Sequence, residues 1–111
     1  MAYDEDLANR IREQLSGEIV VEKKMFGGLA FLIGGNMSVS ASGQGGLLVR
    51  VDPDETEALL AEPGAAEFEM GGRGPMRGWV RVDPEALDDD QTLATWVARG
   101  VGYARSLPAK K

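Results

Sequence analysis

One run near the start of the chain restricts the possible folds more than any other part of the sequence. It reads Lys23-Lys24-Met25-Phe26-Gly27-Gly28-Leu29-Ala30-Phe31-Leu32-Ile33, and Gly34-Gly35-Asn36-Met37 follows it. Residues 19–24 are β-branched and then charged, which favours a strand, and residues 29–33 are apolar on both faces, which favours a buried strand. Gly34, Gly35 and Asn36 tolerate positive φ angles and predict a tight turn into a return strand. Strands joined by such short connections are expected to pair in an antiparallel sheet.

The later strand patterns alternate between apolar and polar side chains. In residues 37–41 the apolar side chains are expected on one face of the sheet and the hydroxyls on the other, which separates Met37, Val39 and Ala41 from Ser38 and Ser40. Residues 47–51, 67–70 and 79–82 alternate in the same way, the second of them as an edge strand, and the glycine-rich residues 71–78 predict a loop. Alternation predicts a sheet that helices cover on one face, with water on the other.

Three helices are predicted around these strands. Asp4 is a candidate cap for the first helix, Asp52-Pro53 opens a short second one, and the closing helix follows Asp88-Asp89-Asp90. The closing helix carries an apolar stripe of Leu93, Val97, Gly100, Val101 and Ala104. We therefore predict one domain over residues 1–111: an α+β two-layer sandwich in the order α-β-β-β-β-α-β-β-α. Its sheet is mainly antiparallel, with about five to six strands.

The composition excludes several classes of chemistry. The sequence has no cysteine and no histidine, so disulfides, thiolate or imidazole metal sites and histidine-dependent catalytic triads are ruled out. The net charge of −6 disfavours non-specific binding to nucleic acid or to an anionic membrane. No apolar run is long enough to span a membrane, and the acidic N-terminus does not resemble a signal peptide. A cytoplasmic protein without a cofactor is the expectation.

Three segments have the composition of ligand sites, and each also has a structural explanation. The glycines of residues 25–28 and 71–74 are candidates for cradling an anion. The segment 25–28, however, is followed by a predicted strand, whereas a phosphate-binding loop is followed by a helix. A bend or turn explains it better. Asp88-Asp89-Asp90 offers hard oxygen ligands, yet three acids at a helix start are explained by capping and by the helix dipole. We predict no metal site and no catalytic residue.

Positive charge is concentrated on the predicted strands and their loops, whereas many acids lie on the helices. If the open face of the sheet holds these cations beside an aromatic ring and the hydroxyls of Ser38 and Ser40, it suits a peptide, a partner protein or single-stranded nucleic acid. The alternative is a solvated face in which the ring packs over arginine stems. The candidate interaction face comprises Lys23, Lys24, Arg50, Arg73, Arg77, Trp79 and Arg81.

Two aromatic residues lie seven positions apart on the closing helix, nearly on one side of it. Trp96 and Tyr103 are candidates for a homodimer seam. The alternative is that both rings pack over the core beneath the sheet. The spacing alone leaves both interpretations open.

The sequence resembles the N-terminal domain of the TfoX/Sxy family, bacterial proteins associated with the regulation of natural competence. The resemblance runs from about Arg10 to Pro108 and depends on the order and spacing of several short pieces. These are Lys24-Met25-Phe26-Gly27-Gly28, Gly35-Asn36-Met37, Leu48-Val49-Arg50-Val51, Gly78-Trp79-Val80, Trp96-Val97, Tyr103-Ala104 and Leu107-Pro108. The resemblance implies a compact domain of sheet and helix and supplies no catalytic residues.

The best-known members of that family resemble a two-domain arrangement with a second, helical domain of helix-hairpin-helix type. This sequence stops at Lys111, which leaves no room for that domain. We therefore expect a non-enzymatic interaction domain that acts through a protein partner or as a homodimer, rather than the competence role of longer members. A nucleic-acid-associated regulator is the second hypothesis. An enzyme acting on a nucleotide is the third, although a dinucleotide-binding glycine loop between strand and helix is absent.

Overall fold

The computed structural model describes residues 3–25, 27–43, 45–69 and 75–108. Within them the chain forms helices α1 (Glu5–Gln14), α2 (Thr56–Leu60) and α3 (Asp90–Ser106). The strands are β1 (Val21–Met25), β2 (Gly28–Ile33), β3 (Asn36–Ala41), β4 (Leu47–Arg50), β5 (Ala65–Glu69) and β6 (Pro75–Val82). Short 3-10 turns, η1 (Pro53–Glu55) and η2 (Pro84–Leu87), precede α2 and α3. The predicted α+β class and element order are confirmed.

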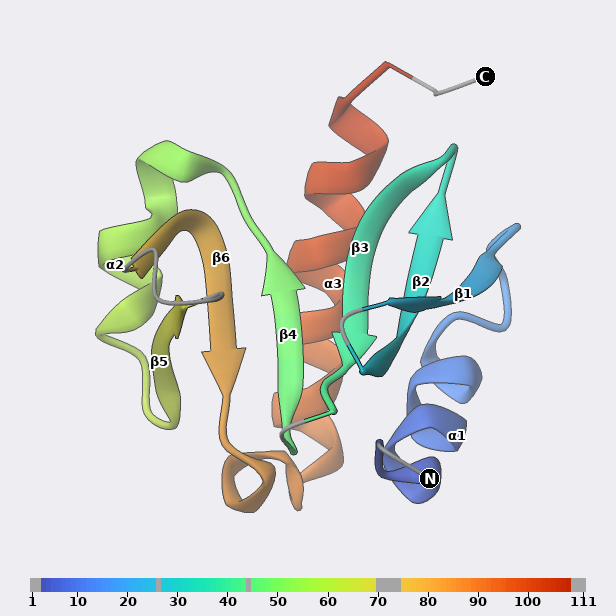
Figure 1. The fold of residues 1–111 in the computed structure, drawn as a ribbon, viewed down its shortest axis with the longest axis horizontal. Helices are drawn as coiled ribbons and strands as arrows, with labels where there is room; N and C mark the ends of the chain where they lie inside the picture. The colour runs from blue at the N-terminus through green and yellow to red at the C-terminus, as the bar shows by residue number, and fades with distance from the viewer. Residues whose placement is uncertain (1–2, 26, 44, 70–74, 109–111) are drawn as a thin grey trace.

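The described strands form one antiparallel sheet in the order β1-β2-β3-β4-β6-β5. Viewed as in Figure 1, α3 runs behind β3 and β4. The main core lies between the sheet and the helices, and Ile11 of α1, Val39 of β3 and Trp96 of α3 are all buried in it. The prediction of helices on one face of a six-stranded sheet is therefore confirmed.

Helix starts follow the sequence signals closely. The Asp4 carboxylate accepts hydrogen bonds from the backbone N–H groups of Asp6 and Leu7 at the start of α1. At the start of α3 the Asp89 carboxylate accepts from the hydroxyl and the backbone N–H of Thr92. These bonds hold the pKa of the Asp89 carboxyl below its usual range, with the Thr92 hydroxyl as the main cause. Capping therefore explains Asp89, the middle acid of the three, as predicted, and Asp90 in the first turn pairs with Arg10.

A β-bulge in β3 corrects the predicted assignment of faces. Phe31 pairs with Val39, but the next residue of β2, Leu32, pairs with Met37, so Ser38 is an extra residue in β3. Because one extra residue reverses the alternation, Met37 does not share a face with Val39 and Ala41, and that expectation was wrong. Val39 and Ala41 lie in the main core, whereas Met37 packs on the opposite face of the sheet.

The second face of the sheet is also less wet than predicted. A smaller apolar cluster is buried there, formed by Ala30, Met37, Leu48 and Phe68, with Leu32 and Trp79 partly buried against it. Two register irregularities, one at Ser38 and one between Glu67 and Glu69, bend the strands. Bulges of this kind increase the local twist, which lets a sheet curl over its own face. The expectation of a solvated second face was therefore wrong for this central region.

Two further expectations are settled by the fold. Strand β6 begins at Pro75 and not at Trp79, because the backbone of Pro75 already pairs with Glu69 of β5, so the predicted loop over residues 71–78 is too long. Proline is acceptable there because it is the first residue of the strand.

Trp96 is only 2% exposed, so it packs in the core of its own chain, which is one of the two interpretations proposed from the sequence.

The closest approach between α3 and the sheet gives the first testable prediction. A Cβ atom added at Gly100 would lie 2.4 Å from the backbone oxygen of Ser38 and 2.8 Å from Cγ1 of Val39. Gly100→Ala is therefore expected to lower the free energy of unfolding by about 1–3 kcal/mol through overpacking. Gly102→Ala, where nothing lies within 4 Å, is expected to raise it by up to about 1 kcal/mol through helix propensity. Urea unfolding of both variants measures the contrast, and equal effects would contradict it.

Candidate functional site

Trp79 and Arg50 lie side by side on the second sheet face, and both are partly exposed. They lie directly opposite each other in the pairing of β4 with β6. The Arg50 guanidinium carbon is 5.8 Å from the centroid of the Trp79 ring and 5.7 Å from that of the Tyr103 ring on α3. On the other side, the ring of Phe68 lies 6.2 Å from Trp79, centroid to centroid, with the planes tilted by 52°. A cation at such distances from two ring centroids is attracted to both rings.

Arg81 extends this surface toward the loop between β3 and β4. It lies opposite Leu48 in the sheet and is partly buried. One of its guanidinium nitrogens, Nη2, donates a hydrogen bond to the backbone oxygen of Gly45 at 3.2 Å. Its stem therefore covers Leu48, and its head supports the loop. We define the Trp79 surface as Arg50, Trp79 and Arg81, the three sequence-predicted residues that the structure brings together.

The two lysines lie elsewhere on the sheet. In the pairing of β1 with β2, Lys23 is opposite Ala30 and Lys24 is opposite Leu29. Ala30 belongs to the cluster on the second face and Leu29 to the main core, so the two lysines point to opposite sides of the sheet. Only Lys23 shares a face with the Trp79 surface, and three strands separate β1 from β6. At the usual strand spacing this is roughly 19 Å across the sheet.

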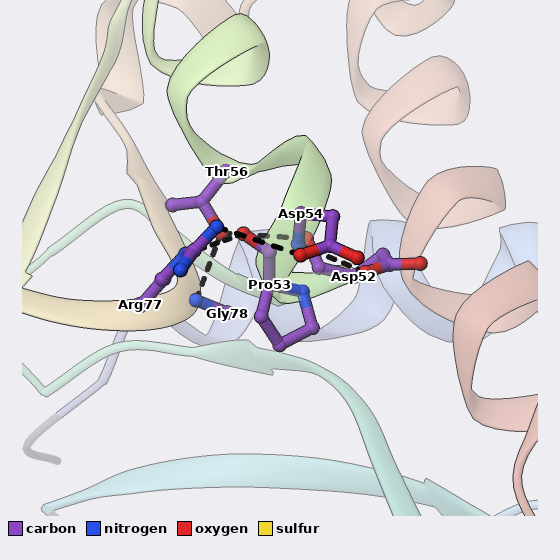
Figure 2. A network of polar contacts seen from close by, with 6 residues as sticks. All are labelled: Asp52, Pro53, Asp54, Thr56, Arg77 and Gly78. Atoms are coloured by element: carbon purple, nitrogen blue, oxygen red, sulfur yellow. Dashed lines mark hydrogen bonds and ion pairs between the residues drawn. The ribbon is translucent and has the colours of Figure 1, made fainter.

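Arg77 takes part in a network of hydrogen bonds at the start of α2. Its Nε donates to the backbone oxygen of Pro53 at 2.9 Å, and its Nη2 lies 3.5 Å from the Asp54 carboxylate. Figure 2 shows these contacts gathered around the turn before α2, where the buried Thr56 hydroxyl also accepts from the backbone N–H of Gly78 at 2.9 Å. The network fastens the middle of β6 to the start of α2. Arg73, the remaining predicted cation, lies outside the described residues.

The two serines proposed for the open face are both buried. Ser38 is fully buried in the bulge, and its hydroxyl donates to the backbone oxygen of Phe31 at 2.8 Å. Ser40 lies on the second face, opposite Ala30 and Leu48 as predicted, but only 3% of it is exposed. Sequence reasoning in turn missed Tyr103 as a neighbour of Arg50, since the two residues come together only when α3 packs beneath β4.

Arg99 lies between two shallow clefts on the helical side, each with a volume of about 310 Å³. Its guanidinium carbon is 4.5 Å from the centroid of the Trp96 ring, and its Nη2 is 3.2 Å from the Glu62 carboxylate at the end of α2. Asp52 and Glu55 line one cleft, and Glu62 and Asp89 line the other. Acids thus accompany the single cation in both clefts, and the arginine joins α2 to α3.

The glycines of the opening run serve as turns. Met25 pairs with Gly28 at the end of the β1–β2 hairpin, and Gly27 has a φ angle of 76°. A Cβ atom on Gly28 would lie 2.2 Å from the backbone oxygen of Ala41, so a larger residue does not fit there. The preferred explanation of this run as a turn is confirmed, with Phe26 outside the described residues.

In the described part of the chain, no acidic side chains group in a way that would hold a metal ion. The helices found there are also too short or too polar to cross a membrane.

The model of the TfoX N-terminal domain family matches residues 13–104. The chain belongs to the TfoX N-terminal domain family. No match was found among curated proteins or among solved structures. The matched range covers the sheet, α2 and most of α3, and therefore includes the whole Trp79 surface of this TfoX N-terminal domain.

The network around Thr56 gives a prediction about stability. Thr56→Val keeps the shape of the side chain but leaves the buried N–H of Gly78 without its acceptor, which is expected to cost about 1–3 kcal/mol in the free energy of unfolding. Thr56→Ser retains the hydroxyl and is expected to lose less than about 1 kcal/mol. Chemical unfolding of the two variants measures the difference. A Val variant as stable as the Ser variant would show that the hydroxyl is not needed.

An ion pair between α1 and β1 gives a prediction about pH. Arg12 donates from Nε and Nη2 to the two carboxylate oxygens of Glu22, at 2.8 and 2.7 Å, and these bonds lower the pKa of the Glu22 carboxyl despite some opposing desolvation. A carboxylate with a lowered folded pKa stabilises the fold above its unfolded pKa of about 4.3, and this stabilisation is lost as the pH falls through the folded value.

Both side chains are more than one third exposed, at 42% and 37%. Solvent screening therefore limits the expected effect of Glu22→Gln to about 0.5 kcal/mol at pH 7. The difference between the wild type and this variant should shrink as the pH falls below about 4. Urea unfolding at a series of pH values follows it, and a difference that grows toward low pH would contradict the assignment.

Proposed function

We propose that this TfoX N-terminal domain is a non-enzymatic interaction domain that recognises a protein partner through the Trp79 surface. The observation that carries the proposal is the Arg50 guanidinium, which lies 5.8 Å from the Trp79 ring centroid and 5.7 Å from that of Tyr103, with Trp79 packed on the apolar cluster of the sheet face without helices. Tryptophan and arginine contribute most often to the energetic centres of protein interfaces. Here both pack against neighbouring aromatic rings of the same chain, and such prior contacts lower the entropic cost of binding.

The charge distribution supports a protein partner over nucleic acid. The chain has a net charge of −6, and the cations of the Trp79 surface are few. Nucleic-acid binding depends on many phosphate contacts and falls steeply with salt. A single arginine–tryptophan centre beside apolar side chains is better suited to a partner with one or two acidic groups around an apolar residue. The sequence, with neither histidine nor cysteine, also lacks the imidazole and thiol groups that many enzymes use for proton transfer and nucleophilic attack.

The proposal predicts the loss of a specific partner on mutation of the surface. Tagged wild-type protein and the variants Trp79→Ala and Arg50→Glu are incubated with lysate of the source organism, and retained proteins are quantified by mass spectrometry. At least one protein is expected to fall by about tenfold or more with both variants, as truncation at an interface centre typically does. Arg105→Gln, at an exposed cation on α3 away from this surface, is expected to retain it.

Circular dichroism of each variant establishes that it remains folded. Retention of the same proteins by all four forms would contradict the proposal. So would retention of nucleic acid whose binding decreases linearly with the logarithm of salt concentration, which supports the nucleic-acid hypothesis instead. A rise in melting temperature with a nucleotide or with S-adenosylmethionine would favour the enzyme hypothesis.

A further inference from the structure

The outer edge of β1 is an open strand edge. β1 stands at one end of the strand order and pairs with β2 alone. Among the described residues, no backbone hydrogen bond joins Val21–Met25 to any segment other than β2. An edge of this kind presents alternate N–H and C=O groups that another extended segment can satisfy.

Two of the exposed side chains at this edge are apolar. Ile19 is 92% exposed and Val21 is 61% exposed, and these are the large hydrophobic residues that stand out to solvent in the described part of the chain. Both lie at the beginning of β1 or just before it. Single exposed hydrophobic residues are ordinary, but two of them beside an unpaired strand edge mark a place where further burial would stabilise a complex.

The charged side chains of β1 indicate which kind of segment would bind at this edge. Glu22 accepts hydrogen bonds from two guanidinium nitrogens of Arg12, Nε and Nη2, so that pair carries no net charge. Lys23 and Lys24 remain, exposed and on opposite faces of the strand. The edge is therefore positive on both faces within a chain of net charge −6. Opposite charges directly across a strand pair are favourable, and like charges are not.

Three of the five registers in which a second copy of β1 could pair with the first conflict with this charge pattern. In a continuous antiparallel sheet, residues that oppose each other lie on the same face, so a two-fold axis places one residue opposite its own copy. An axis at Glu22, Lys23 or Lys24 places that charge against its own copy, which is unfavourable for that pair. An axis at Val21 or Met25 gives no such clash, and the sedimentation test below distinguishes that second copy from an acidic partner.

We infer that β1 is a docking edge for an extended acidic segment of a partner protein, which adds to the sheet as a seventh strand with carboxylates facing Lys23 and Lys24 and an apolar side chain covering Val21. This inference rests on the proposed role as an interaction domain and gives the chemistry of the partner. Main-chain hydrogen bonds supply the common part of the affinity, and the two lysines supply the selection for acidic sequence.

The test uses the full chain and a defined probe: a peptide of about seven residues, the length of a typical strand, with glutamates and a valine on each face. A peptide of the same length with lysines in place of the glutamates is the control. Fluorescence anisotropy measures the affinity of each, and amide hydrogen exchange followed by NMR locates the contact. We expect the acidic peptide to bind about tenfold more tightly than the basic one and to slow exchange of the outward-facing amides of β1 by about tenfold.

Matched variants separate the edge from the rest of the molecule. The double variant Lys23→Gln, Lys24→Gln is expected to bind the acidic peptide about tenfold more weakly. The double variant Lys23→Arg, Lys24→Arg keeps both charges and is expected to bind it as the wild type does. Trp79→Ala is expected to leave peptide binding at β1 unchanged, so this experiment and the partner-capture experiment can fail independently.

Three results would overturn the inference. One is equal binding of the acidic and basic peptides, or of neither at millimolar concentration. Another is slowed exchange at the Trp79 surface without any change in β1, which would leave the proposed function intact and remove the edge from it. The last is a concentration-dependent dimer in sedimentation that protects the β1 amides without peptide, which would assign the edge to a second copy.

Discussion

The contact between Gly100 of α3 and the backbone of Ser38 is the constraint on which the arrangement of the molecule depends. The helix can approach the bulged part of β3 this closely only because position 100 has no side chain. The bulge, in turn, sends Met37 to the second face, where it completes a small apolar cluster with Leu48. One glycine and one extra strand residue therefore determine what both faces of the sheet present.

The parts of the fold that depend on local signals were predictable. Asp4 and Asp89 cap their helices because a short carboxylate at that position can reach the free N–H groups of the first turn, whatever lies around it. The β1–β2 hairpin follows from glycines between two strand-forming segments. The edge position of β5 agrees with its short, acidic sequence.

Other features could not be predicted because they arise from long-range packing or from one residue of register. No feature of the composition indicates the bulge at Ser38. The bulge changes the sheet face to which Met37 points, so alternation alone assigned that residue to the wrong face. Arg50 meets Tyr103 because a helix more than fifty positions later crosses beneath β4. Arg77 turns to the start of α2 through a long-range contact of the same kind. The division of Lys23 and Lys24 between the two faces of β1, by contrast, follows from strand alternation alone.

The strand order also has a consequence for the route by which the chain reaches its fold. Strands β1 to β4 are neighbours in both sequence and space, so hairpin contacts with short loops can assemble them in succession. β6 is different: it inserts between β4 and β5 and pairs Leu47 with Val82. That pairing must close the whole intervening segment, including α2, before it gains any contact, and loop closure of this kind slows folding. The N-terminal meander can thus form early and act as the template on which β6, and with it the Trp79 surface, is completed last.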